Sequence, residues 1–167
     1  MGLLFHRQVQ VIHLYLARNI LEVLGSTAAF FVVYVALISR NEVSLPKDWG
    51  LLYAGWFLLA LMSSGLANML AALSLRYDLM ERLVPVLSYA LIPVSGAFVM
   101  ADWVPSRFRD MYLLVPLAHG IEMVRAGVFG EFVATHYHFW YALAWAGILN
   151  FFAMILLADA RDRVDNG

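Results

Sequence analysis

The sequence predicts an all-α protein, a polytopic membrane helix bundle with four transmembrane spans, a re-entrant pair of short helices and an N-terminal interfacial helix. Of its 167 residues 63% are hydrophobic and 14% are charged, whereas about 25% of the residues of a soluble domain are charged. Residues 49–75, 83–101 and 132–158 contain no Asp, Glu, Lys or Arg. Each segment reaches the ~18 apolar residues with which a helix crosses the hydrocarbon core.

Composition also excludes several function classes. The apolar length excludes a soluble enzyme, and 11 basic against 12 acidic residues leave no positive face for nucleic acid. The chain has no cysteine and hence no cysteine-based metal site or nucleophile. Its one lysine, Lys47, is not part of a G-x-x-x-x-G-K-[ST] motif, so the chain has no P-loop for a nucleotide.

The N-terminal residues 1–18 have the pattern of an interfacial helix, followed by a transmembrane domain over 19–167. Polar residues of the first segment share one arc of a helical wheel, which is typical of a helix lying on a membrane surface. They are His6, Arg7, Gln10, His13 and Arg18. The first span, about 19–39, follows directly, and Arg18 and Glu22 are spaced to form an i,i+4 ion pair.

The second and third spans, about 51–75 and 83–100, are joined by a charged loop. Small residues at four-residue spacing in the second span (Ser63, Ala67 and Ala71) predict close packing against another helix. Pro93 predicts a kink in the third span. The loop carries Arg76, Asp78, Glu81 and Arg82, and is either a solvated turn or a docking site for a soluble partner.

Residues 103–130 predict the re-entrant hairpin. Pro105 and Pro116 stand where prolines open helices, and Gly127 stands where a glycine closes one. The helices over 105–114 and 116–126 are too short to cross the membrane, since 11 residues extend only about 16 Å. Broken helices at membrane depth are tolerated where they are buried in protein or line a cavity.

The last span covers about 139–158. Six of the 11 Lys and Arg residues fall on the side of the termini, which mildly favours cytoplasmic termini.

Ionisable residues recur every three positions in the second short helix, at His119, Glu122 and Arg125. Ionisable groups at membrane depth indicate function, although an equally good interpretation is that Glu122 and Arg125 pair locally and pin the hairpin. His136 and His138 form an H-x-H that could bind a metal with His119 and Glu122, but interfacial histidines are the far commoner explanation. We therefore assign no metal site and no catalytic residue.

The stretch from Pro116 to Gly130, PLAHGIEMVRAGVFG, resembles the P-x-x-H-G-[IV]-E-x-x-R-x-G-x-F-G signature of capsule-polysaccharide export permeases, the membrane subunits of type-2 ABC exporters. Three further stretches match in order: the opening LFHR running into LAR, the SGAF that ends the third span, and WVP followed by Arg109-Asp110. The resemblance covers the family's C-terminal four-span portion, so the chain is expected to lack two N-terminal spans and to be a fragment, a shortened gene product or the result of a misplaced start.

This resemblance implies a permease subunit rather than an enzyme, in the bacterial inner membrane with both termini cytoplasmic. Its expected partners are an ABC ATPase subunit that binds the ATP, a second permease copy, a lipid-linked polysaccharide and membrane lipid. The loop with Arg76, Asp78, Glu81 and Arg82 would dock the ATPase. The hairpin would cap the translocation path with a set of six residues: His119, Glu122, Arg125, Gly127, Phe129 and Gly130.

Aromatic residues near the hairpin suit either stacking on sugar rings or anchoring at the membrane interface. They are Trp103, Tyr112, Tyr137 and Trp140. Two other function classes stay open at this point: an intramembrane enzyme that uses His119 and Glu122, and a small membrane scaffold subunit. The hairpin disfavours the scaffold, since a scaffold gains little from broken helices.

Overall fold

The computed structural model describes residues 11–165, and it describes the side chains of all of these except residues 11, 12, 131 and 160–165. Throughout this range the ordered elements are helices, which confirms the all-α prediction. They are α1 (Val11–Ser39), α2 (Trp49–Arg76), α3 (Asp78–Val94), the 3-10 turn η2 (Ala101–Trp103), α4 (Ser106–Tyr112), α5 (Pro116–Phe129), the 3-10 turn η3 (Gly130–Phe132) and α6 (Phe139–Asp165).

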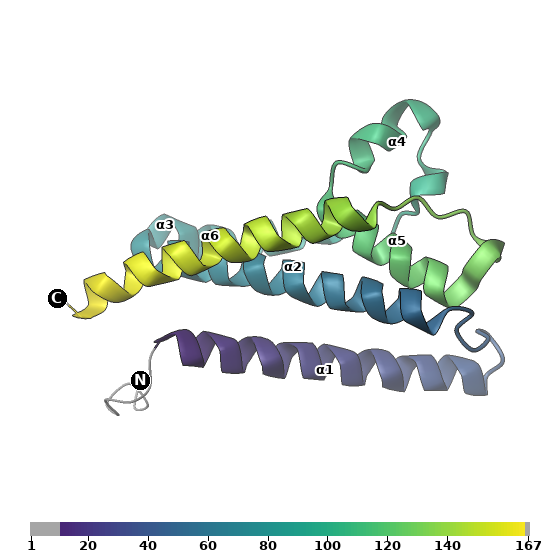
Figure 1. Cartoon of the computed structure of the whole chain (residues 1–167), viewed down its shortest axis with the longest axis horizontal. Helices are drawn as coiled ribbons and strands as arrows, with labels where there is room; N and C mark the ends of the chain where they lie inside the picture. The colour runs from purple at the N-terminus through teal and green to yellow at the C-terminus, as the bar shows by residue number, and fades with distance from the viewer. Residues whose placement is uncertain (1–10, 166–167) are drawn as a thin grey trace.

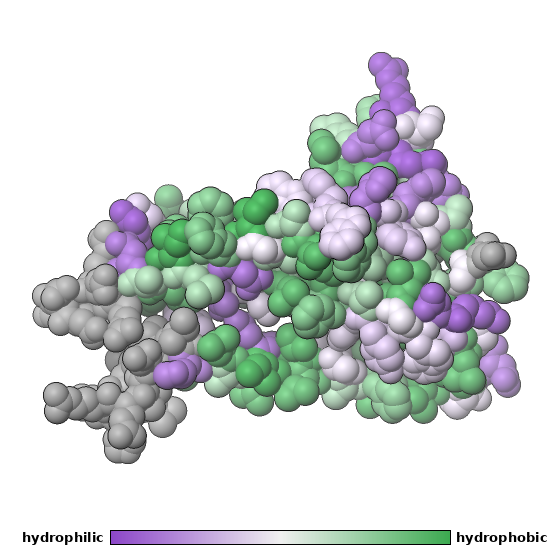
Figure 2. All heavy atoms as spheres, viewed as in Figure 1, coloured by the Kyte–Doolittle hydropathy of each residue, from purple (hydrophilic) through white to green (hydrophobic). Residues whose placement is uncertain are grey.

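Three helices are long and apolar enough to cross a membrane, and a bent pair of short helices passes the same test jointly. The three are His13–Ser39 within α1, Trp49–Arg76 and Phe139–Asp159 within α6. Their side chains are mostly exposed, and Figure 2 shows hydrophobic residues along the lengths of these helices and hydrophilic residues gathered around α4. A surface of this kind is suited to lipid rather than to water.

Helix α2 is the centre of the molecule (Figure 1). Helix α6 packs along it, α5 covers its N-terminal half, and α1 runs beside it with few contacts. The buried core lies where α2, α5 and α6 meet, around Leu58, Met62, Met123 and Ala146. Helix α1 begins, and α6 ends, at the same end of the bundle.

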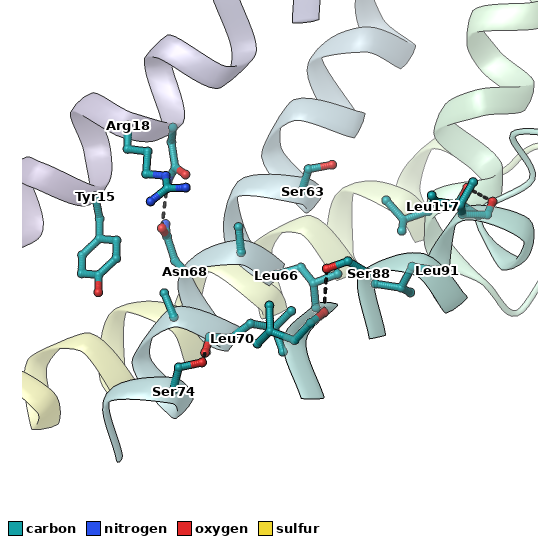
Figure 3. Close-up of a pocket in the computed structure, with 16 residues that line it drawn as sticks. Tyr15, Arg18, Ser63, Leu66, Asn68, Leu70, Ser74, Ser88, Leu91 and Leu117 are labelled. Carbon is teal, nitrogen blue, oxygen red and sulfur yellow. Dashed lines mark hydrogen bonds between the residues drawn. The ribbon is translucent and has the colours of Figure 1, made fainter. Parts of the chain in front are cut away.

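Glycines allow the central helices to approach closely. A Cβ on Gly127 would lie 2.5 Å from the backbone nitrogen of Leu52, and one on Gly65 would lie 2.9 Å from the backbone nitrogen of Asn150. The small-residue row predicted for this purpose is different: Ser63 and Ala67 are exposed and line a pocket between α1, α2 and α3 (Figure 3). The predicted row is thus not the face of α2 that meets α5 and α6, although Ala72 beside it is buried and Asn68 beside it is hydrogen-bonded to Asn19 of α1.

The N-terminal boundary also differs from the prediction. Helix α1 is continuous from Val11 to Ser39, so it runs straight through the boundary at residues 18 and 19 that was predicted between the interfacial helix and the first span. No glycine or proline stands at this junction to stop the helix. Residues 1–10 of the predicted interfacial helix lie outside the described residues. The predicted ion pair between Arg18 and Glu22 is not among the ion pairs of the described residues.

The predicted charged loop 76–82 is a tight corner between two helices. Only Tyr77 is non-helical, because α2 ends at Arg76 and α3 starts at Asp78. Asp78 and Glu81 lie in the first turn of α3, where acidic side chains favour a helix start. Most residues of the predicted loop therefore belong to the beginning of α3.

Helix α3 ends at Val94, so the third span predicted over residues 83–100 is helical only in part. Residues 95–100 leave the helix at Gly96, whose φ of 90° suits glycine. Instead of kinking at Pro93, the helix terminates one residue later.

The short helices α4 and α5 are bent by 108° at the break between them, a geometry that fits either a broken span or the predicted re-entrant pair. Helix α5 begins at Pro116 as expected but continues through Gly127 to Phe129, and Gly130, with a φ of 60°, caps it. At 14 residues, or about 21 Å, α5 is still shorter than the ~30 Å hydrocarbon core.

Candidate functional site, a backbone clamp on α5

The ionisable face of α5 points into the protein. His119 is 1% exposed and Glu122 is 0% exposed, and the side chain of Arg125 is 13% exposed. Spacing of three residues places all three on one side of the helix. Each forms hydrogen bonds with backbone groups of the segments between the longer helices, so we call these three residues the backbone clamp.

The Glu122 carboxylate accepts hydrogen bonds from the backbone of two loops and from the Arg125 side chain. Its Oε1 accepts hydrogen bonds from the backbone N–H of Ala101 (3.2 Å) and from the Arg125 guanidinium (2.8 Å). Its Oε2 accepts one from the backbone N–H of His136 (3.2 Å). The carboxylate therefore satisfies two backbone donors that no helix supplies with partners, one before α4 and one before α6.

Arg125 satisfies the backbone between α3 and η2. Its guanidinium donates to the carbonyl oxygens of Gly96 (2.7 Å), Ala97 (3.1 Å) and Val99 (3.0 Å). These carbonyls follow the end of α3, where the helical hydrogen-bond pattern has stopped. A planar guanidinium with five donors is suited to several acceptors arranged in this way.

His119 joins the turn before α5 to the segment before α6, which Glu122 also binds. Its Nε2 lies 2.8 Å from the carbonyl oxygen of Leu113, and its Nδ1 lies 3.1 Å from the backbone nitrogen of His138. Because a backbone N–H only donates, Nδ1 is the acceptor and Nε2–H donates to Leu113. The ring of Tyr141 packs edge-on against the imidazole with centroids 5.0 Å apart, and its hydroxyl donates to Leu114.

A second, more exposed layer surrounds the clamp. Arg109 donates to the carbonyl oxygens of Ala101 (3.0 Å) and Asp102 (3.3 Å) and pairs with the Asp102 carboxylate at 3.4 Å. His136 Nε2 lies 3.6 Å from the same carboxylate. This layer fixes η2 to the last turn of α4 and to the segment before α6.

The geometry supports the interpretation in which Glu122 and Arg125 hold the broken segment in place. Both oxygens of Glu122 and both ring nitrogens of His119 are engaged internally. Within the described part of the chain, no three His, Cys, Asp or Glu residues are grouped so that they could hold a metal ion. The clamp is therefore suited to organising backbone, because its polar side-chain atoms already have partners within the protein.

The other predicted hairpin residues lie at the end of α5. Gly127 contacts α2 at Leu52, Phe129 is partly exposed, and Gly130 caps the helix above Lys47. A role of these residues in a translocation path stays a prediction.

The four predicted sugar-stacking aromatics divide into two kinds. Trp103 is 68% exposed and Trp140 is 77% exposed. Tyr137 packs against the core, and the Tyr112 hydroxyl donates to the carbonyl oxygen of Val99 under Gly96. Only the two tryptophans present most of their rings to the outside.

The predicted docking residues gather at the corner between α2 and α3, at the end of the bundle where α6 terminates (Figure 1). Asp78, Glu81 and Arg82 are exposed, and Arg76 pairs with Asp159 of α6 at 3.5 Å. The corner is thus a charged surface held to α6.

Sequence reasoning missed the acceptors and donors that the clamp binds, because they are backbone groups. It also missed Asn150, whose Nδ2 donates to the carbonyl oxygen of Leu61 across the α2–α6 interface at 2.9 Å. A signal was present, since a lone amide in an apolar span usually bonds between helices.

The chain has long apolar helices and a broken helical segment, and buried side chains form hydrogen bonds with the backbone of that segment. These features define a polytopic membrane protein with a discontinuous helical element. Residues 4–129 match the family described as ABC-2 type transporter. The chain therefore belongs to the ABC-2 type transporter membrane family, which contains membrane components of transporters and not enzymes.

Relatives in this family include capsule export proteins. The chain is 31% identical over 157 residues to the capsule polysaccharide export inner-membrane protein CtrC of Neisseria meningitidis serogroup B, covering 94% of this chain and 59% of CtrC. It is 32% identical over 136 residues to the capsule polysaccharide export inner-membrane protein BexB of Haemophilus influenzae, covering 81% of this chain and 51% of BexB. It is 23% identical over 133 residues to the polysialic acid transport protein KpsM of Escherichia coli, covering 80% of this chain and 52% of KpsM. The chain thus spans between half and three fifths of the length of these relatives.

Proposed function

We propose that this chain is a permease subunit of an ATP-driven exporter. The exporter would move lipid-linked capsular or related polysaccharide across the bacterial inner membrane. The observation that carries the proposal is the family match over residues 4–129 together with relatives named for capsule polysaccharide export. The clamp supports it: the ionisable residues of α5 stabilise a broken helix, the kind of element that membrane proteins keep where backbone lines a path.

The energy source would lie on another subunit. The chain has no P-loop, so ATP would bind and be hydrolysed on an ABC ATPase partner. We place the docking site at the α2–α3 corner, with Arg76, Asp78, Glu81 and Arg82. Movement of the ATPase at this corner would be transmitted along α2 to the clamp, because α5 packs directly on α2.

A second permease copy would complete the translocation path, with the bent α4–α5 pair at its far end. The exposed rings of Trp103 and Trp140 lie near this bend and are available for stacking on sugar rings. The buried members of the clamp would not contact the polysaccharide.

Charge reversal at the corner tests the proposal in the bacterium that makes this protein. We expect Glu81→Lys with Arg82→Glu to abolish copurification of a P-loop ATPase and to reduce surface polysaccharide at unchanged membrane levels of the protein. Reversal of the exposed Arg40–Glu42 pair at the other end of α1 is the matched control and should change neither. Full surface polysaccharide after deletion of the gene would refute the export function itself.

A further inference from the structure

The turn η2 and the segment before α6 lie together at the end of the bundle where α4 projects, away from the termini (Figure 1). On the buried side, Glu122 accepts hydrogen bonds from the backbone N–H groups of Ala101 and His136, each at 3.2 Å. On the outer side, Oδ1 of Asp102 lies 3.6 Å from Nε2 of His136. Because Glu122 holds the backbone of both segments, these two side chains stay close without a bond between them.

The contact between Asp102 and His136 is incomplete. Its 3.6 Å separation is too long for a hydrogen bond from a ring nitrogen. The Nε2 atom of His136 is buried and has no hydrogen-bond partner among the described residues, although 37% of its side chain and 47% of that of Asp102 are exposed. A buried polar atom without a partner costs free energy, so a stronger interaction at this nitrogen would be stabilising.

The charges around this contact are balanced. The described charged and titratable side chains near His136 come from η2, α4, α5 and its own segment, and are Asp102, Arg109, Glu122, Arg125, His119 and His138. The four charged groups form two ion pairs, at 3.4 and 2.8 Å, and the two other histidine rings lie against each other with centroids 5.9 Å apart. Helix α6 has no Asp, Glu, Lys or Arg before Asp159. Of the described groups, the Asp102 carboxylate is thus the one that faces Nε2 of His136.

We propose that His136 and Asp102 form a proton-dependent latch between η2 and the segment before α6. Histidine is the side chain that ordinarily changes charge between about pH 5 and 8, and a protonated imidazole donates from both ring nitrogens. Protonation turns the 3.6 Å contact into an attraction between an imidazolium and a carboxylate, and a small side-chain rotation brings the two atoms to hydrogen-bond distance. The latch therefore stabilises this end of the molecule at acidic pH, and that stabilisation is lost as the pH rises.

The latch acts on the broken part of the fold. The turn η2 leads into α4, whereas the segment before α6 enters a helix that packs along α2. Closing the latch thus ties the α4 side of the bend to the main bundle, and opening it leaves the connection between these two segments to Glu122. This inference rests on the geometry of the described residues and does not depend on the proposed export function.

Amide hydrogen exchange of the purified full chain in detergent micelles tests the latch at about pH 5.5 and about pH 7.5, within the range in which histidine changes charge. The amides of Trp103 and Val104 donate within η2. After correction for the intrinsic effect of pH on exchange, we expect both to exchange about two- to fivefold more slowly at the lower pH, as for a partly exposed ion pair.

Two variants each remove one of the charges, and both should abolish this pH difference. They are His136→Gln and Asp102→Asn. His13→Gln is the matched control, because it removes an exposed histidine at the start of α1, at the other end of the bundle, and should leave the difference unchanged. Each variant is compared with itself at the two pH values, so a variant that is loosened overall still reports the latch, and His136→Gln alone decides if Asp102→Asn does not fold.

Four results would overturn the proposal. The first is equal exchange of the Trp103 and Val104 amides at the two pH values in the wild type, and the second is slower exchange at the higher pH. The third is a pH difference that persists in either His136→Gln or Asp102→Asn, which would assign it to another group. The fourth is a difference of the same size at the amide of Met80, which donates to Tyr77 at the opposite end of the bundle.

Discussion

Removal of the Glu122 carboxylate is the sharpest perturbation of the clamp. In Glu122→Ala the backbone N–H groups of Ala101 and His136 lose their acceptor, and the Arg125 guanidinium loses its counter-charge. Breaking a buried ion pair by removing one partner costs about 3–5 kcal/mol, and each buried donor left without a partner costs about 1–3 kcal/mol. These losses share one site and are not additive, so we expect a destabilisation of about 4 kcal/mol.

Glu122→Gln distinguishes a clamp from mere space filling. Glutamine has nearly the same shape, but one of its two terminal groups is a donor, and every partner of Glu122 is also a donor. One partner must therefore face another donor, and we expect a loss of about 2 kcal/mol. Glu42→Gln is the matched control: Glu42 pairs with Arg40 at 3.8 Å with side chains 53% and 75% exposed, so its loss should cost less than about 1 kcal/mol.

Two measurements on protein in detergent micelles check this reasoning. Denaturation with increasing sodium dodecyl sulfate gives the order of stability, which should be wild type and Glu42→Gln, then Glu122→Gln, then Glu122→Ala. Amide hydrogen exchange reports the local effect, and the amides of Ala101 and His136 should exchange faster in Glu122→Ala. Unchanged exchange at both amides would refute the clamp even if the variant were destabilised, because general loss of packing could explain the stability alone.

Two predictions concern the packing of α2. Gly127→Ala places a Cβ within 2.5–2.8 Å of Leu52 backbone and side-chain atoms and should destabilise the bundle by about 1–3 kcal/mol. Gly25→Ala is the control, because no atom lies within 4 Å of the new Cβ. It should be neutral or slightly stabilising in the same denaturation assay. Asn150→Leu removes the hydrogen bond to Leu61 across the α2–α6 interface and should cost about 0.6–1.7 kcal/mol, while a gain in stability would show that the amide is not used between these helices.

The sequence predicted the helix content and the start of α5 because these depend on local signals. Apolar length predicts a membrane helix without any knowledge of its neighbours, and Pro116 marks a helix start through its fixed φ and missing N–H. The helix ends were less predictable. Gly127 looked like a terminator but is needed as a contact surface for Leu52, and Gly130 is the residue with the positive φ that ends the helix.

The clamp could be predicted only in part. Spacing placed His119, Glu122 and Arg125 on one face, and the cost of charge in lipid showed that the face needs partners. The partners are backbone groups of residues 96–101, 113 and 136–138, and every residue has such groups. Nothing in a side-chain pattern marks them, so the role of the motif became visible only with the course of the loops.

The hydrogen bonds divide the bundle into two mechanical parts. The clamp joins the end of α3, η2, the turn before α5 and the start of α6 to one helix, and α5 and α6 in turn pack on α2. Helix α1 is held to α2 by far less: the Asn19–Asn68 hydrogen bond, a hydrogen bond from Trp56 to Thr27, and the contact of Phe30 with the Trp56 ring. Large movements in packed proteins are rigid-body shifts at the weaker interfaces. If the proposed export function is correct, a transport cycle would therefore move α1 against a body that the clamp keeps intact.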